Sequence, residues 1–381
     1  PLKESFAGFA GIAEEVPVAD NMKVMRAVTT GGSTALYFGV TKLPDLNTFA
    51  KKDIDLYNEL EEAKKEIPLD TLPNNLMAEQ SKRLQESASD LGYTFKKNLM
   101  LIDQKKCGTG YSYDAKWKAK SWVYEAKKNG ANLVNRASVN KILLERDRAV
   151  GVEYFDGVRK NGTRIRHVYG KKVIISAGSL ATPIILRNSG ITDIADRGFY
   201  CKPGIVMFGT VPGMKGEDSF LGSMSAEIDE GLELGDGNMS AMLFKMLMLS
   251  IFKPHELFSH SKTITVGLTL DDEMSGEIKE NGRYYKTLTE RELKKIHDGE
   301  EVAARMLRKA GAKKIFKGNI TAGNPSGVIR IGDHINSNLE TKFHNLHICD
   351  ASVLSEDMRV TPTLTLICLA KYLAGHVAKT I

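Results

Sequence analysis

The feature that most constrains the fold lies near the C-terminus, where a buried strand, a polar turn and a helix follow one another closely. Residues 345–349 (NLHIC) form an apolar run of the length of a buried parallel strand, and the run stops at Asp350. Thr361 and Pro362 then have the residue types of an N-cap and a first helical position. Apolar residues spaced for one helix face follow at Leu364, Ile367, Cys368, Leu369, Leu373 and Val377. The chain is therefore expected to have an α/β fold.

Residues 171–190 (KKVIISAGSLATPIILRNSG) repeat the same pattern, with a strand over residues 173–176 and a helix from Thr182 to Gly190. The tight turn between them contains Ala177 and Gly178. A helix N-terminus beside a strand end offers unpaired N–H groups and a positive dipole end, which suit a phosphate or an electron-rich ring. Any α/β protein also contains such corners without a ligand, so the pattern alone leaves both interpretations open.

Several short segments resemble the glucose-methanol-choline (GMC) family of flavin oxidoreductases. The segments are GGST at residues 31–34, GSLATPIILRNSGI at 178–191, NPSG at 324–327, NLET at 338–341, DASV at 350–353 and PTLTL at 362–366. The resemblance implies an FAD-binding Rossmann-like domain and a second, α+β domain with an antiparallel sheet that holds a small-molecule substrate. It assigns residues 1–204 and 321–381 to the first domain, with a helical insertion over residues 45–92, and 205–320 to the second.

The resemblance also implies which residues form the site. Carried over from the family motifs, the residues that contact FAD are Gly31, Gly32, Ser33, Val139, Ala177, Gly178, Asp350, Ala351, Pro362 and Thr363. The catalytic positions are Asn324 and Thr361, where the family usually has a histidine base and its Asn or His partner. A carboxamide is not basic near neutral pH, so Asn324 cannot accept the hydroxyl proton as imidazole does. The nearby His334, His344 and His347 are interpreted as surface or strand-edge residues.

In the family, a G-x-G-x-x-G turn that opens a helix holds the FAD pyrophosphate. No G-x-G-x-x-G occurs in the 381 residues. Three explanations stay open: the N-terminal segment has been lost from this chain, a partner chain supplies it, or FAD binding has decayed. The leading hypothesis is an FAD-dependent oxidoreductase acting on CH–OH groups, and the alternative is a catalytically inactive subunit that pairs with another chain.

Within residues 205–320, residues 205–211 and 263–270 alternate apolar and polar residues. This alternation predicts antiparallel strands with one face open to solvent. Thr289 and Glu292 form a T-x-x-E capping box, which predicts a helix over residues 290–310 that Gly311 ends. A second helix is expected over residues 116–129, and an antiparallel ribbon between residues 131 and 169 with charged turns.

Composition excludes several other classes. The four cysteines are far apart and have no C-x-x-C spacing, so no metal site is predicted. No apolar run reaches the roughly 18 residues that span a bilayer, and no signal-peptide pattern is present, which favours a cytoplasmic location. The net charge of +6 is spread along the chain, so a nucleic-acid-binding function would rest on charge alone.

Overall fold

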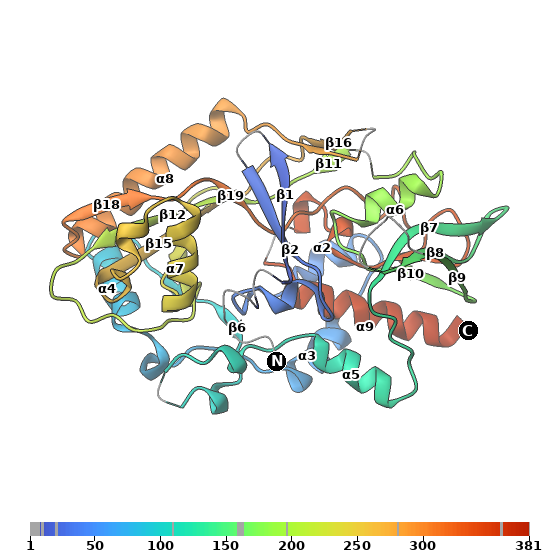
Figure 1. Ribbon diagram of the computed structural model, residues 1–381, viewed down its shortest axis with the longest axis horizontal. Helices are drawn as coiled ribbons and strands as arrows, with labels where there is room; N and C mark the ends of the chain where they lie inside the picture. Colours follow the sequence, from blue (N-terminus) through green and yellow to red (C-terminus); the bar gives the residue numbers. More distant parts are fainter. Residues whose placement is uncertain are drawn as a thin grey trace.

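A computed structural model describes residues 8, 11–19, 22–108, 110–157, 164–195, 197–279, 282–358 and 361–380. Most of the charged turn predicted over residues 156–164 lies outside these ranges. Figure 1 shows two lobes along the long axis, one built on a large sheet with α4, α7 and α8, the other containing β7–β10, α6 and α9. The β1–β2 hairpin lies between them in this view.

A nine-stranded sheet forms the first lobe. Its order is β1 (Ala13–Ala19), β2 (Met22–Ala27), β19 (Thr321–Ala322), β12 (Pro203–Thr210), β15 (Thr263–Leu270), β14 (Leu232–Asp236), β13 (Met224–Asp229) and β5 (Lys96–Lys97), with β18 (Lys314–Lys317) also on β12. All its pairs are antiparallel except β2 with β19. The sheet thus includes strands from both sides of residues 205–320, and that predicted domain boundary stays a prediction.

Helices cover the sheet on both faces. Ile205 and Met207 share a core with α8 (Glu290–Lys309) and α4 (Glu79–Ser89). The predicted capping box between Thr289 and Glu292 is present at the start of α8. On the opposite face, Phe208 packs against α7 (Ala241–Ser250). The expectation that β12 is open to solvent on one face is therefore wrong, because the apolar helix α7 shields that face.

The second lobe contains the two predicted strand–turn–helix corners. The strand β10 (Val173–Ile175) pairs in parallel with β20 (Leu346–Ile348) and leads to α6 (Thr182–Asn188). The expected ribbon is β7 (Ala137–Glu145), β8 (Arg148–Asp156) and β9 (Arg164–Tyr169). The C-terminal helix α9 (Thr363–Thr380) packs against α3 (Tyr57–Glu66). The helix α9 begins one residue later than predicted, at Thr363 instead of Pro362.

Smaller elements connect the lobes. They are β3 (Val40–Thr41), β4 (Leu69–Thr71), β6 (Leu99–Leu101), α2 (Leu46–Ala50), α5 (Lys120–Lys128), β11 (Arg197–Phe199), β16 (Gly276–Ile278) and β17 (Tyr284–Tyr285). The helices α2, α3 and α4 lie within residues 45–92, as predicted for the helical insertion, whereas α5 begins four residues later than expected. Among the described residues no helix is long and apolar enough to cross a bilayer.

A fully buried ion pair links the segment that contacts β1 to the segment that precedes β12. The Lys286 ammonium lies 2.8 Å from the Asp272 carboxylate, and both side chains are inaccessible to solvent. Asp272 also accepts hydrogen bonds from the amides of Cys201 and Lys202, just before β12, while the Lys286 amide donates to the Val18 carbonyl in β1. Removing either charge would leave the other buried and unpaired, so this pair holds the two segments in a defined position.

Candidate active site

The carboxylate of Asp350 ties the two strand–turn–helix corners together. Its Oδ2 accepts hydrogen bonds from the Gly178 amide at 2.9 Å and the Thr182 hydroxyl at 2.5 Å. Its Oδ1 accepts one from the Ser352 amide at 2.8 Å. The side chain is only 8% exposed, so these charge-assisted bonds are shielded from water. The predicted contacts Ala177, Gly178, Asp350 and Ala351 therefore lie on two adjoining turns at the carboxyl end of the parallel strands β10 and β20.

Three buried hydroxyls, two of them on these turns, have no hydrogen-bond partner among the described residues. They belong to Ser179 and Ser352, on the two turns, and to Thr365 in the first turns of α9. Each residue is 3% exposed or less. Buried hydroxyls are nearly always paired, and leaving one unpaired costs about 1–3 kcal/mol. This set of unpaired hydroxyls fits a corner that holds a polar group such as a flavin nucleotide.

The loop with Gly31, Gly32 and Ser33 is clamped to the start of α5. Gly31 has φ 91°, and a Cβ there would lie 2.7 Å from the Lys120 nitrogen, so only glycine fits. The Thr34 hydroxyl accepts the Ala119 amide at 3.0 Å. On its other side the loop is open, because a Cβ at Gly32 would meet nothing within 4 Å and Ser33 is exposed. The backbone of this loop is therefore held in place by the start of α5 on one side and is accessible on the other.

Asn324 lies on a segment that connects the hairpin to the Asp350 turn. It follows β19, whose Ala322 pairs with Val24 of β2. Asn324 is exposed and has φ 45°, a left-handed conformation that asparagine tolerates better than most residues. Five residues later, the Ile329 amide donates to the Ser352 carbonyl at 2.9 Å. The Asn324 carboxamide is therefore accessible, and the other end of its segment is hydrogen-bonded to the turn that follows Asp350, where FAD is predicted to bind.

Thr361 contacts β3 through its carbonyl oxygen. The Lys42 amide and the Thr41 hydroxyl both lie 3.4 Å from this oxygen. The Thr41 hydroxyl also accepts the Leu364 amide at 3.0 Å, in the first turn of α9. Thr361 was expected to be the N-cap of this helix, but the amide of Leu364 is satisfied by a threonine more than 300 residues away. The predicted contacts Pro362 and Thr363 are at the start of α9, where Pro362 accepts the first helical bond, from Leu366.

Sequence reasoning missed a charged cluster that connects Thr361 with the Asn324 segment. The Lys42 ammonium lies 3.0 Å from Glu233 on β14, and Lys202 lies 4.0 Å from the same carboxylate and 3.2 Å from Asp271. The Lys42 amide contacts Thr361, while the Gly323 amide contacts the Lys202 carbonyl. No local motif marks these residues, because they come from four distant segments.

The environment of Glu233 keeps its carboxylate charged. Burial by itself disfavours the charged form, but Lys42, the Ser225 hydroxyl at 2.5 Å and Lys202 outweigh it and lower the pKa of Glu233. Only 20% of this side chain is exposed. The cluster therefore places a partly shielded carboxylate on β14, paired with Lys42, whose amide contacts Thr361, and with Lys202, whose carbonyl contacts Gly323.

The remaining predicted residues lie in different surroundings. Val139 is 39% exposed on β7, a strand that contacts α6. His334 accepts the Arg330 amide through Nδ1 at 3.0 Å, and His344 has an exposed side chain. His347 is completely buried, which corrects its interpretation as a surface or strand-edge residue. Burial lowers the pKa of His347 and favours the neutral ring.

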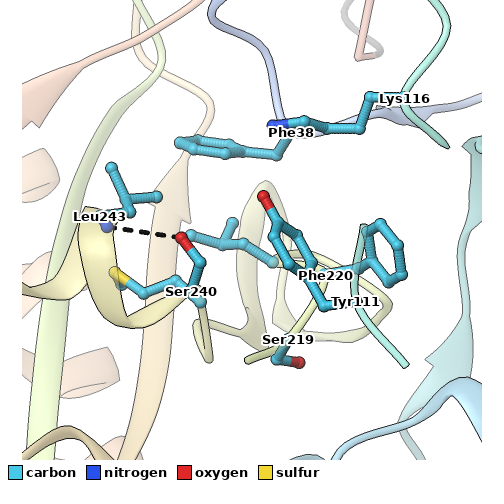
Figure 2. Close-up of a pocket in the computed structure, with 9 residues that line it drawn as sticks. Phe38, Tyr111, Lys116, Ser219, Phe220, Ser240 and Leu243 are labelled. Atoms are coloured by element: carbon cyan, nitrogen blue, oxygen red, sulfur yellow. Dashed lines mark hydrogen bonds between the residues drawn. The ribbon is translucent and has the colours of Figure 1, made fainter. Parts of the chain in front are cut away.

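A small pocket lies between Phe38 and α7 (Figure 2). In the view, Phe38, which follows the glycine loop, lies above the pocket, Leu243 on α7 lies at its left side, and Tyr111 lies below Phe38. The cavity is about 10 Å³, enough for one water molecule. Its lining also includes Lys116, Ser219, Phe220, Leu221, Met239 and Ser240. A larger hollow of about 430 Å³ lies at Lys52, Met274, Arg330, Ile331, Asp333, Ser355 and Glu356.

Comparison with known proteins agrees with this geometry. The family model described as GMC oxidoreductase matches residues 21–202. An uncharacterized protein of Methanocaldococcus jannaschii is 24% identical over 355 residues, which cover 92% of this chain and 87% of that protein. A long-chain-alcohol oxidase of Arabidopsis thaliana is 21% identical over 347 residues, covering 72% of this chain but only 46% of that protein.

Solved structures show the same fold. Pyridoxine 4-oxidase from Mesorbium loti superposes with a TM-score of 0.66 at 14% identity, covering 97% of this chain and 89% of that one. A formate oxidase variant of Aspergillus oryzae superposes with a TM-score of 0.67 at 14% identity, covering 97% and 88%. Fold and site define a mixed α/β protein with the architecture of FAD-binding flavoproteins. Over residues 21–202 the chain is similar to GMC oxidoreductases.

Proposed function

We propose that this protein is an FAD-dependent oxidoreductase that acts on the CH–OH group of a small organic substrate. The observation that carries the proposal is the pair of parallel strands β10 and β20, whose carboxyl-end turns are tied by Asp350 and carry the unpaired buried hydroxyls of Ser179 and Ser352. Ligands of open α/β sheets bind at this end of the strands. The backbone at Gly178 and Ala351, with the glycine loop at Gly31, would hold the flavin nucleotide.

FAD would supply the hydride acceptor, and the residues of this chain would bind and orient the alcohol. The Asn324 carboxamide can hydrogen-bond to the substrate oxygen but cannot take its proton. The Glu233 carboxylate is charged and lies on the sheet face next to Lys42, whose amide contacts Thr361. Its lysine partners keep the pKa of Glu233 low, which makes it a weak base, so we assign to Glu233 the role of positioning the Lys42 and Lys202 segments.

The phosphate-binding turn is proposed to come from outside residues 1–381. Among the described strands, β10 pairs only with β20, and Ile174 on β10 is 45% exposed. Parallel sheets are normally larger than two strands and buried on both faces. A strand that precedes a G-x-G-x-x-G turn would fit this edge, whether it belongs to the same gene product or to a partner chain.

The test is an FAD titration followed by the visible absorbance of the flavin. Residues 1–381 alone are expected to bind FAD weakly, and addition of the preceding segment or the partner chain should restore tight binding. Anaerobic flavin reduction by a panel of alcohols then tests the activity. Full-length protein that stays colourless with excess FAD would refute the flavoenzyme and support the catalytically inactive subunit.

A further inference from the structure

The surface beyond α7 exposes aromatic side chains to an unusual degree. Phe252 is 90% exposed and Phe258 is 86% exposed, and Leu249 beside them is 47% exposed. The next most exposed large apolar side chain among the described residues is Tyr169, at 67%. Figure 1 shows α7 on the outside of the sheet lobe, over β12 and β15. A cluster of exposed apolar side chains in one short segment marks a surface that binds a membrane or another molecule.

The backbone conformation of Phe252 indicates that its exposed side chain has a function. The Lys253 amide donates to the Met248 carbonyl and the Phe252 amide to the Leu249 carbonyl, so α7 ends in a Schellman motif. In this motif Phe252 occupies the left-handed position, with φ 56°, which normally belongs to glycine. A bulky aromatic residue is strained there, and its ring gains no burial within the chain. Neither packing nor backbone preference explains a phenylalanine at this position.

Basic side chains surround the exposed rings. Residues 241–262 contain Lys245, Lys253 and Lys262 against one acid, Glu256. The Lys245 ammonium lies 5.6 Å from the centre of the Phe258 ring. Glu256 is buried and pairs with Lys314, so it does not offset the lysines at the surface. The acidic Asp218 is at the opposite end of α7, where it accepts the Ala241 amide.

We propose that α7 and the turn after it bind the surface of a membrane that contains anionic lipids. The rings of Phe252 and Phe258 and the Leu249 side chain would enter the boundary between headgroups and acyl chains, while the lysines contact the anionic headgroups. This arrangement of apolar tips with a basic rim is complementary to a charged bilayer, and α7 is far too short to span one.

The pocket beneath α7 does not extend this proposal to a substrate. Leu243 on α7 and Met239 before it line the small pocket that reaches Phe38, next to the glycine loop. Because this pocket holds no more than one water molecule, it is not a path by which a membrane-dissolved alcohol reaches the flavin side. Membrane binding itself does not require FAD, so its test is separate from that of the oxidoreductase activity.

The test is sedimentation of the full-length protein with vesicles of phosphatidylcholine alone or with one quarter phosphatidylglycerol. Wild-type protein is expected to bind the anionic vesicles and to be released as salt rises from 0.1 to 0.5 M. Phe252→Gly and Phe258→Ser should each weaken binding about tenfold, because each removes an inserted aromatic ring. Phe252→Gly is informative because glycine suits the left-handed position, so its thermal midpoint should equal or exceed that of the wild type.

Tyr169→Ser is the matched control, since it removes an exposed aromatic side chain on β9, away from α7. It should bind vesicles like the wild type. Equal binding by wild type and Phe252→Gly/Phe258→Ser, or no wild-type binding to anionic vesicles at 0.1 M salt, would overturn the proposal. A wild-type mass by light scattering twice that of the double variant would also overturn it, because the patch would then join two copies of the chain.

Discussion

Replacement of Asp350 by asparagine tests whether this carboxylate holds the cofactor corner together. The substitution keeps the shape of the side chain but turns one acceptor oxygen into an NH₂ donor. If the remaining oxygen faces Gly178 and Thr182, as in the native structure, the new NH₂ group faces the Ser352 amide, and two donors oppose each other. A hydrogen bond to a charged group contributes about 1.5–3 kcal/mol, and a buried unpaired donor costs a further 1–3 kcal/mol. We expect a loss of about 3 kcal/mol.

The assay is urea unfolding followed by far-UV circular dichroism. With an m-value of about 4 kcal/mol/M for a chain of this size, the midpoint should fall by about 0.75 M. Asp70→Asn is the control, because Asp70 is exposed and, in the part of the chain that the structure describes, accepts only the neighbouring Thr71 amide; its midpoint should stay within about 0.1 M of the wild type. A shift for Asp350→Asn no larger than that of Asp70→Asn would refute the reasoning.

Three further substitutions test other parts of the structure. Thr41→Val removes the hydroxyl that caps Leu364 and should lower the free energy of unfolding by about 1–2 kcal/mol in urea, whereas an unchanged midpoint would mean that water caps α9 equally well. Burial lowers the pKa of His347, so below the unfolded value near 6.5 the unfolded chain binds more protons than the folded chain, and stability falls as pH drops. Between pH 7 and pH 5 the urea midpoint should therefore fall less in His347→Gln than in the wild type, whereas the exposed His344→Gln should lose as much as the wild type. Equal losses in all three proteins would assign the pH dependence to other groups. Asn324→His restores a proton acceptor at a position whose left-handed backbone histidine tolerates, and should speed anaerobic flavin reduction by alcohols about 10²–10⁴-fold at pH 8. No acceleration would mean that the side chain at position 324 does not reach the substrate hydroxyl.

The local features of the fold were predictable because neighbouring residues determine them. The strand, turn and helix at residues 173–188 follow from an apolar run, a glycine that tolerates φ 85° and a proline in the first helical turn. The capping box at Thr289 and Glu292 needs only two residues three positions apart. The family motifs are likewise short segments, so they could be read one at a time.

The tertiary structure decided the contacts between residues that are far apart in the chain. Asp350 reaches Gly178 across 172 positions, Lys42 reaches Glu233 across 191, and Thr41 caps Leu364 across 323. Local propensity carries no information about such partners, because a side chain's partner depends on which segments pack together. The Glu233 cluster could not be predicted for this reason. His347 was misjudged for the same reason: a polar residue in a short strand is buried or exposed according to what covers that strand, and only the packed structure decides this.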